Sequence, residues 1–265
     1  MDNVKVLTVA THSYGFFEKM VNNDYGITVE VLGYGKKWTG FRMKLQEVYD
    51  RIKDLPDDNI VIFLDGFDTI IRGKLNVAVE RFKKMKCPVL FSNQAELFGR
   101  RGSYIEKRVF GTCYDNNTAN SGLYMGYVKY IKQLLTYALQ SSCKDDQCVI
   151  NSLCKYVDYI KIDVNNEIFH NIAYGTDKEV LAESNAIFFQ IPGLPGKKRY
   201  MRSIQEYSQF FIIELILLFI ILIFIFFYLK FMVIGYIIVV IMIMYFSWID
   251  TSCAYTLLPG YNIKS

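Results

Sequence analysis

Two carboxylates follow a strongly apolar segment in the first third of the chain. Asp65 and Asp68 come directly after Ile60 to Leu64, with Gly66 between them. Carboxylates that follow a buried strand lie at the edge of an open α/β sheet where ligands bind. There they can hold a hard divalent cation, which bridges the phosphates of a nucleotide. An ordinary strand-to-helix turn also favours Asp and Gly, so the pair alone leaves both interpretations open.

The segments around these carboxylates alternate between strand and helix patterns. Short apolar or β-branched runs predict strands, and apolar positions spaced three and four residues apart predict helices. We expect strands at 4–10, 28–32, 60–64, 89–91, 121–128 and 186–190, and helices at 42–53, 75–85, 131–140 and 146–156. This alternation implies an α/β fold class, with a mainly parallel sheet that the last strand closes.

Length, charge and cysteine spacing limit the classes of function. The 265 residues hold one ordinary domain plus an appendage. The net charge is only +4, with basic residues scattered among acidic ones, which argues against nucleic acid as a partner. The six cysteines form no C-x-x-C pair. We therefore expect reduced thiols rather than a zinc site.

An apolar excess is concentrated near the C-terminus. Residues 210–248 contain only two charges, Glu214 and Lys230. One bilayer crossing takes about 20 residues, so this stretch predicts a transmembrane hairpin of two helices, about 210–229 and 231–248. The alternative is a single tilted span followed by an interfacial segment. We accordingly divide the chain into a domain at 1–200, a basic linker at 201–209, the membrane region at 210–248 and a tail at 249–265.

The flanks of the apolar stretch predict its orientation. The N-terminus lacks the pattern of a signal peptide. Basic residues cluster at 197–202, just before the apolar stretch. By the positive-inside rule the first domain faces the cytosol. The sequence thus predicts a multi-pass membrane protein with membrane lipid as a partner.

Seven short blocks in the first domain occur in a specific order. They are Leu7 to Thr11, Leu32 to Gly40 with Trp38, the helix that contains Lys44, the strand ending in Asp65 and Asp68, Val89 to Ser92, Asn120 to Gly126, and Asp145 to Gln147. In these blocks, over residues 4–198, the chain resembles the glycosyltransferase domain of the procollagen lysyl hydroxylases and of related collagen glucosyl- and galactosyltransferases.

The resemblance implies a GT-A-type, Rossmann-like fold that binds a UDP-sugar together with Mn²⁺. Asp65 and Asp68 would be metal ligands. The uridine pocket would be lined by Thr8, Ala10 and Thr11, with Trp38 and Lys44 close to the nucleotide.

The resemblance also implies residues around the donor sugar. Asn120 to Gly122 would approach the sugar through a loop whose Gly allows close backbone contact. Asp145 and Asp146 match an acidic pair beside the transferred sugar, where a carboxylate can bind hydroxyls or act on the acceptor. Asp ahead of a helix is also a common N-cap, and one residue could serve each role.

The chain departs from the family at the third metal ligand. The family carries a His near the end of the domain, and Gln190 stands at that position here. A carboxamide oxygen can ligate a hard cation but is a weaker donor than imidazole for manganese.

These observations predict a metal-dependent hexosyltransferase. Its donor would be UDP-glucose or UDP-galactose, and its acceptor a hydroxyl group, such as that of hydroxylysine or galactosyl-hydroxylysine in a collagen-like protein. The alternative is a non-catalytic, membrane-tethered protein that binds nucleotide sugars or glycans through a degenerate metal site.

Overall fold

The structure, a computed structural model, describes residues 3–94, 106–113, 116–172, 183–191, 211–229 and 232–248, together with Ser208 and Cys253. The chain divides into two units, one comprising Met1–Leu194 and the other Pro195–Asn262. The basic cluster at 197–202 lies outside the described residues, as do the linker at 201–209 and the tail at 249–265 apart from Ser208 and Cys253.

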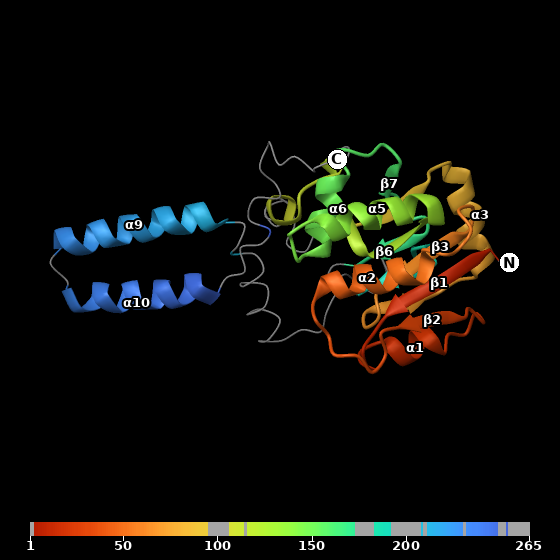
Figure 1. The fold of residues 1–265 in the computed structure, drawn as a ribbon, viewed down its shortest axis with the longest axis horizontal. Helices are drawn as coiled ribbons and strands as arrows, with labels where there is room; N and C mark the ends of the chain where they lie inside the picture. Colours follow the sequence, from red (N-terminus) through yellow and green to blue (C-terminus); the bar gives the residue numbers. More distant parts are fainter. Residues whose placement is uncertain are drawn as a thin grey trace. The chain divides into compact units, whose positions relative to one another are not determined.

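The first unit is built on a six-stranded sheet with the order β2-β1-β3-β6-β5-β7. Its strands are β1 (Val4–Val9), β2 (Val29–Leu32), β3 (Ile60–Leu64), β5 (Val89–Asn93), β6 (Ala119–Tyr127) and β7 (Ile160–Asp163). Strand β6 runs antiparallel to β3 and β5, and the other pairs are parallel. The predicted mainly parallel α/β sheet is therefore confirmed (Figure 1).

Helices cover both faces of this sheet. Helices α2 (Phe41–Ile52), α5 (Val128–Gln140) and α6 (Asp146–Leu153) contact one another on one face. Helices α1 (Phe17–Val21) and α3 (Leu75–Met85) contribute Met20 and Phe82 to the core on the other. Side chains alternate along β3 accordingly. Ile62 joins the core with Phe82, and the ring of Phe63 faces Lys44 of α2 at 5.5 Å.

A second, three-stranded sheet has the order β4-β9-β8. It consists of β4 (Thr69–Ile71), β8 (Phe169–Asn171) and β9 (Phe188–Gln190). We expected 186–190 to close the main sheet, and that prediction is wrong. Strand β9 pairs instead with β4, which begins directly after Asp68, and with β8. An apolar run predicts a buried strand but carries no information about its partner.

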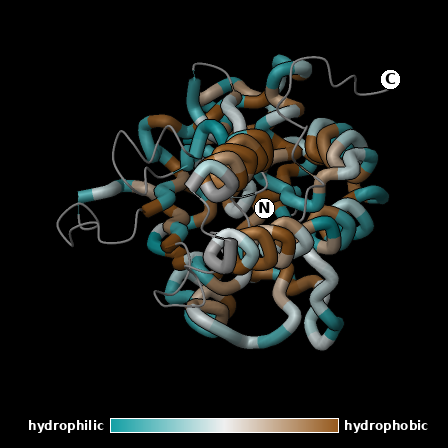
Figure 2. Tube along the Cα trace, turned by 90° about the vertical axis from the view of Figure 1, so that its left-hand side faces the viewer, coloured by the Kyte–Doolittle hydropathy of each residue, from teal (hydrophilic) through white to brown (hydrophobic). Residues whose placement is uncertain are grey.

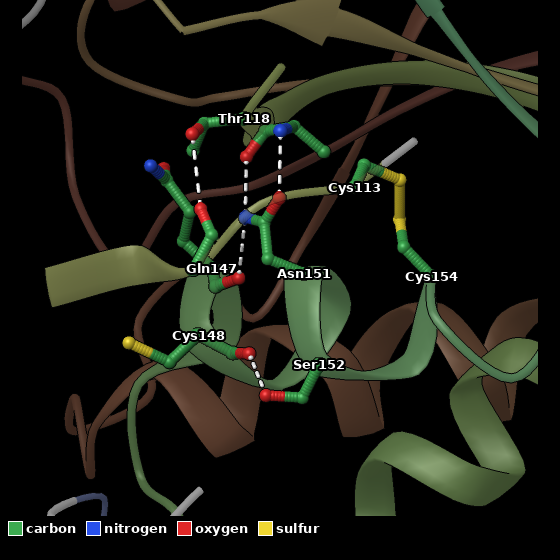
Figure 3. The surroundings of a disulfide bond; sticks show 9 residues. Cys113, Thr118, Gln147, Cys148, Asn151, Ser152 and Cys154 are labelled. Atoms are coloured by element: carbon green, nitrogen blue, oxygen red, sulfur yellow. Dashed lines mark hydrogen bonds between the residues drawn. A yellow bond between two sulfur atoms is a disulfide. The ribbon is translucent and has the colours of Figure 1, made fainter. Parts of the chain in front are cut away.

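A disulfide joins Cys113 to Cys154, so the prediction of reduced thiols is wrong for this pair. Cys154 is the C-cap of α6. Three residues earlier on the same helix, the Asn151 side chain bonds to both the N–H and the C=O of Ala119 at 2.8 and 2.9 Å (Figure 3). The end of α6 is thus fixed to the start of β6. Disulfides are typical of proteins in oxidising compartments.

The second unit contains two apolar helices, α9 (Ile212–Leu229) and α10 (Met232–Trp248) (Figure 2). The rings of Phe219 and Phe246 contact each other at 6.3 Å, and the hydroxyls of Ser208 and Tyr245 are hydrogen-bonded.

These helices correct the membrane prediction. In the part of the chain that the structure describes, neither α9 nor α10 qualifies as a bilayer-spanning helix, and nor does any other helix. The predicted transmembrane hairpin and multi-pass location are therefore wrong, and the cytosolic orientation inferred from them loses its basis.

The disulfide should stabilise the first unit. It closes a loop with a sequence separation of 41, so the Cys113→Ser/Cys154→Ser variant should lose about 3 to 4 kcal/mol of unfolding free energy. Urea denaturation measures this loss. Equal stability of the two proteins under oxidising conditions would contradict the prediction.

Candidate functional site

Asp65 and Asp68 are fixed by backbone hydrogen bonds at the carboxyl end of β3. The Asp65 N–H donates to the Gly122 carbonyl at 2.8 Å, and the Asp68 carbonyl accepts from the Ile191 N–H at 2.8 Å. The turn between β3 and β4 is therefore held by β6 on one side and by the end of β9 on the other.

Gln190 lies beside both carboxylates, as its position in the sequence predicted. Its side-chain nitrogen, Nε2, is 3.3 Å from Asp65 Oδ2 and 3.3 Å from Asp68 Oδ1. Gln190 is almost fully buried, and its Oε1 atom has no hydrogen-bond partner among the described residues. Its backbone is anchored in β9, in register with Thr69 of β4. The structure thus brings together all three residues expected to hold a metal.

A bulge in β6 brings its backbone against these side chains. Phe91 of β5 pairs with Tyr124, but the next residue, Ser92, pairs with Asn120, so residues 121–123 are extra. The Asn120 side chain stabilises the bulge by accepting the Gly122 N–H at 2.8 Å. A Cβ atom on Gly122 would lie 2.5 Å from Gln190 Nε2 and 2.9 Å from Asp65 Oδ2. Only glycine leaves room for both groups.

A buried ion pair joins helices α2 and α6. Lys44 of α2 and Asp146 at the start of α6 are both almost fully buried and in direct contact. Burial alone would lower the pKa of Lys44, but the negative charges of Asp146 and Asp65 outweigh it and raise that pKa above its ordinary value. Lys44 therefore stays charged at neutral pH. Because its positive charge interacts with both Asp146 and Asp65, it couples the acidic pair Asp145–Asp146 electrostatically to the pair Asp65–Asp68.

The two members of the second acidic pair have different surroundings. Asp145 is the N-cap of α6, where its side chain accepts the Cys148 N–H at 2.8 Å. Asp146 faces Lys44 instead. Asp145 therefore caps the helix, whereas Asp146 is held by Lys44; a role of either carboxylate toward a sugar stays a prediction.

The residues expected around a nucleotide divide into buried and exposed ones. Thr8 and Ala10 are buried at the end of β1, next to Gly66. Thr11 is partly exposed, with its hydroxyl 3.0 Å from His12 Nδ1. Trp38 is 42 % exposed and packs edge-on against Phe41. Of this set, Thr11 and Trp38 are the ones accessible to a ligand.

Three further carboxamides adjoin the site and were missing from the predicted set. Gln94 Oε1, just after β5, accepts hydrogen bonds from the side chains of Asn120, Gln147 and Asn171. Gln147 directly follows Asp145 and Asp146, and Gln94 follows a predicted strand. Sequence reasoning could therefore have included both residues among the candidates for the site. Asn171 lies on β8, a strand too short to be recognised.

The arrangement offers oxygen donors for a cation at one edge of the sheet. Within the described residues, no group of three or more His, Cys, Asp or Glu side chains could hold a metal ion. The available set is two carboxylates and one carboxamide, which suits a hard cation rather than a transition metal that prefers imidazole or thiolate.

Comparisons with known proteins identify relatives of the first unit. A family model described as "PLOD GT domain" matches residues 1–189. A procollagen-lysine,2-oxoglutarate 5-dioxygenase of Drosophila melanogaster is 27% identical over 201 residues, which cover 68% of this chain and 27% of the relative. The human procollagen-lysine,2-oxoglutarate 5-dioxygenase 2 is 28% identical over 206 residues, covering 69% and 27%.

The name of a third relative includes the word glycosyltransferase. The human multifunctional procollagen lysine hydroxylase and glycosyltransferase LH3 is 24% identical over 204 residues, covering 68% of this chain and 26% of the relative. The chain therefore spans about a quarter of the length of the curated relatives that it matches.

The ion pair should be detectable in stability measurements. Lys44→Met leaves Asp146 buried without its counter-charge, so we expect a loss of about 3 to 5 kcal/mol of unfolding free energy. The Lys44→Met/Asp146→Leu double variant removes both charges and should recover most of that loss. Urea denaturation of the four proteins of this cycle gives the coupling.

The exposed pair of Lys84 and Glu80 provides the control, because Lys84→Met removes a similar ammonium group from the surface. A double variant as unstable as the Lys44→Met single variant would show that the two buried charges are not coupled.

Proposed function

Because this chain belongs to the family of PLOD GT domains, we propose that it is a glycosyltransferase that moves a hexose, glucose or galactose, from a UDP-sugar to a hydroxyl acceptor. The observation that carries the proposal is the convergence of Asp65, Asp68, Gln190 and Gly122 at one sheet edge, with the Lys44–Asp146 pair beside them. Ligands of open α/β sheets bind at this edge.

The residues present fit a divalent cation such as Mn²⁺. Gln190 Oε1 is a buried acceptor without a partner among the described residues, next to two carboxylates. Rotation of the carboxamide would exchange Nε2 for Oε1 and offer a third oxygen to the cation without changing the shape of the side chain. When bound, the cation would neutralise charge that develops on the leaving diphosphate.

The chain's own charges would act on the donor in two ways. Lys44 keeps its proton because Asp146 and Asp65 raise its pKa, so it supplies a fixed positive charge near the diphosphate side of the site. Asp146, held in place by Lys44, would accept a hydrogen bond from a hydroxyl of the sugar or of the acceptor. Gly122 would let the β6 backbone approach the sugar closely.

The acceptor we propose is hydroxylysine or galactosyl-hydroxylysine in a collagen-like protein. The names of the relatives, which refer to procollagen lysine and in one case to glycosyltransferase, support this class.

One observation favours a second candidate, a non-catalytic protein that binds nucleotide sugars or glycans. Gln190 Nε2 already donates to Asp65 and Asp68, and this neutral contact partly substitutes for a cation. Release of UDP from UDP-glucose and UDP-galactose by the purified chain, with and without Mn²⁺, separates the candidates. Tight UDP-sugar binding without turnover, in the presence of acceptor peptides that carry hydroxylysine, would support the binder.

The carboxylates should be required for binding. Asp65→Ala and Asp68→Ala should each weaken UDP binding in the presence of Mn²⁺ by about 100-fold, or about 2.7 kcal/mol, because the cation would lose a charged ligand. Calorimetric titration measures the affinity. Asp57→Asn changes a carboxylate that is exposed and paired with Lys132, and it should bind like the wild type. Unchanged binding in both Ala variants would remove the carboxylates from the site.

The third ligand should limit the affinity for manganese. Gln190→His should tighten Mn²⁺ binding, by about tenfold, because imidazole is a better donor to this ion than a carboxamide oxygen. The titration is carried out at a pH where His is neutral. Mg²⁺, which prefers oxygen ligands, should gain less. Equal Mn²⁺ affinity of the two proteins would show that Gln190 is not a ligand.

A further inference from the structure

Four side chains form a carboxamide cluster beside the site: Gln94, Asn120, Gln147 and Asn171. They come from the end of β5, the β6 bulge, the first turn of α6 and the end of β8. All three partners donate to one atom, Gln94 Oε1, from distances of 2.9 Å for Asn120, 3.1 Å for Gln147 and 3.4 Å for Asn171. The cluster is therefore organised around a single acceptor.

That acceptor has more donors than it can satisfy. A carbonyl oxygen has two lone pairs, and the shorter contacts from Asn120 and Gln147 account for both. Asn171 makes the longest contact, so it is the surplus donor. Moving its amide away from Gln94 would leave the Gln94 oxygen fully hydrogen-bonded and would cost little.

Asn171 also has an acceptor without a donor. Its side chain is 5% exposed, and no donor among the described residues reaches its Oδ1 atom. A buried acceptor in this condition costs about 1 to 3 kcal/mol, and buried polar groups are nearly always satisfied by protein, water or ligand. Asn171 therefore has a surplus donor and an unmet acceptor on the same carboxamide.

The position of Asn171 indicates which ligand group would meet it. Asn171 pairs in register with Gln190, the residue that contacts Asp65 and Asp68. On the other side, Asn120 connects the cluster to Gly122. A group bound here would lie next to the diphosphate of a donor held at the carboxylates. A hydroxyl group both donates and accepts one hydrogen bond, which matches the two unmet capacities of the carboxamide.

We infer that Asn171 is a specificity-determining residue that binds a hydroxyl group of the transferred hexose. Its Oδ1 atom accepts the hydroxyl hydrogen, and its amide group leaves Gln94 to donate to the hydroxyl oxygen. Gln94 keeps Asn120 and Gln147 in place during this exchange. The inference rests on the proposed function, because it assumes a UDP-sugar at the site.

The test compares UDP with UDP-glucose and UDP-galactose by calorimetric titration of the full chain in Mn²⁺. Asn171→Ser should weaken the UDP-hexose that the wild type prefers by about tenfold and leave UDP affinity within about twofold, because only the hexose contacts residue 171. Asn185→Ala, which removes an exposed carboxamide near β9, is the matched control and should bind both ligands like the wild type.

Deoxy analogues of the UDP-hexose make the test independent of how well the variant folds. In the wild type, removal of the contacted hydroxyl should weaken binding by about tenfold, and in Asn171→Ser the same removal should have no effect. If no analogue binds more weakly than the parent to the wild type, or if Asn171→Ser binds UDP-hexose like the wild type, the inference is overturned. A wild-type chain that binds neither UDP nor UDP-hexose would instead contradict the proposed function.

Discussion

The site depends on one backbone hydrogen bond, from Asp65 N–H to the Gly122 carbonyl. It joins the end of β3 to the bulge of β6 and thereby sets the distance between the two acidic side chains and the glycine backbone. The bulge exists because Asn120 replaces a ladder partner by accepting the Gly122 N–H. The carboxylates, the Gln190 amide and the carboxamide cluster are arranged around this junction.

The acidic side chains near this junction contact two kinds of partner, a charged ammonium group and a neutral carboxamide. Lys44 compensates Asp146 with a full positive charge, and both side chains are buried. Loss of either partner lowers the stability of the fold strongly, because the other charge is left buried without its counter-charge. Asp65 and Asp68 both lie against the neutral carboxamide of Gln190, and Lys44 acts on Asp65 at longer range. One buried ammonium group is therefore coupled to both acidic pairs.

The sequence predicted the fold and the site where a residue pattern has only one structural explanation. The apolar run at 60–64 had to be a buried strand, and the carboxylates after it had to lie at a sheet edge. The position of Gln190 beside them followed from block order, because the family's third ligand occupies that place. By contrast, β4, β7 and β8 are three or four residues long, too short for a periodic pattern.

Features that depend on pairing over long distances were not predictable. Nothing in the spacing of Cys113 and Cys154 indicates that they meet, and the hydrogen bonds of Gln94 come from residues 26, 53 and 77 positions away. The membrane prediction failed for a different reason. Apolar composition over 210–248 predicted two membrane-spanning helices, and two helices do form there, but among the described residues no helix qualifies to span a bilayer.

The place of β6 in the sheet has a consequence for biosynthesis. Strand β3, fully buried in the finished fold, has one edge that is covered only by β6, and about 60 residues separate the two strands. At ribosomal rates of 5–20 residues per second, that edge stays open for roughly 3 to 12 seconds. An open apolar edge is a template for pairing with other chains. The interval between Leu64 and Tyr127 is therefore a period in which a nascent chain benefits from protection by a chaperone.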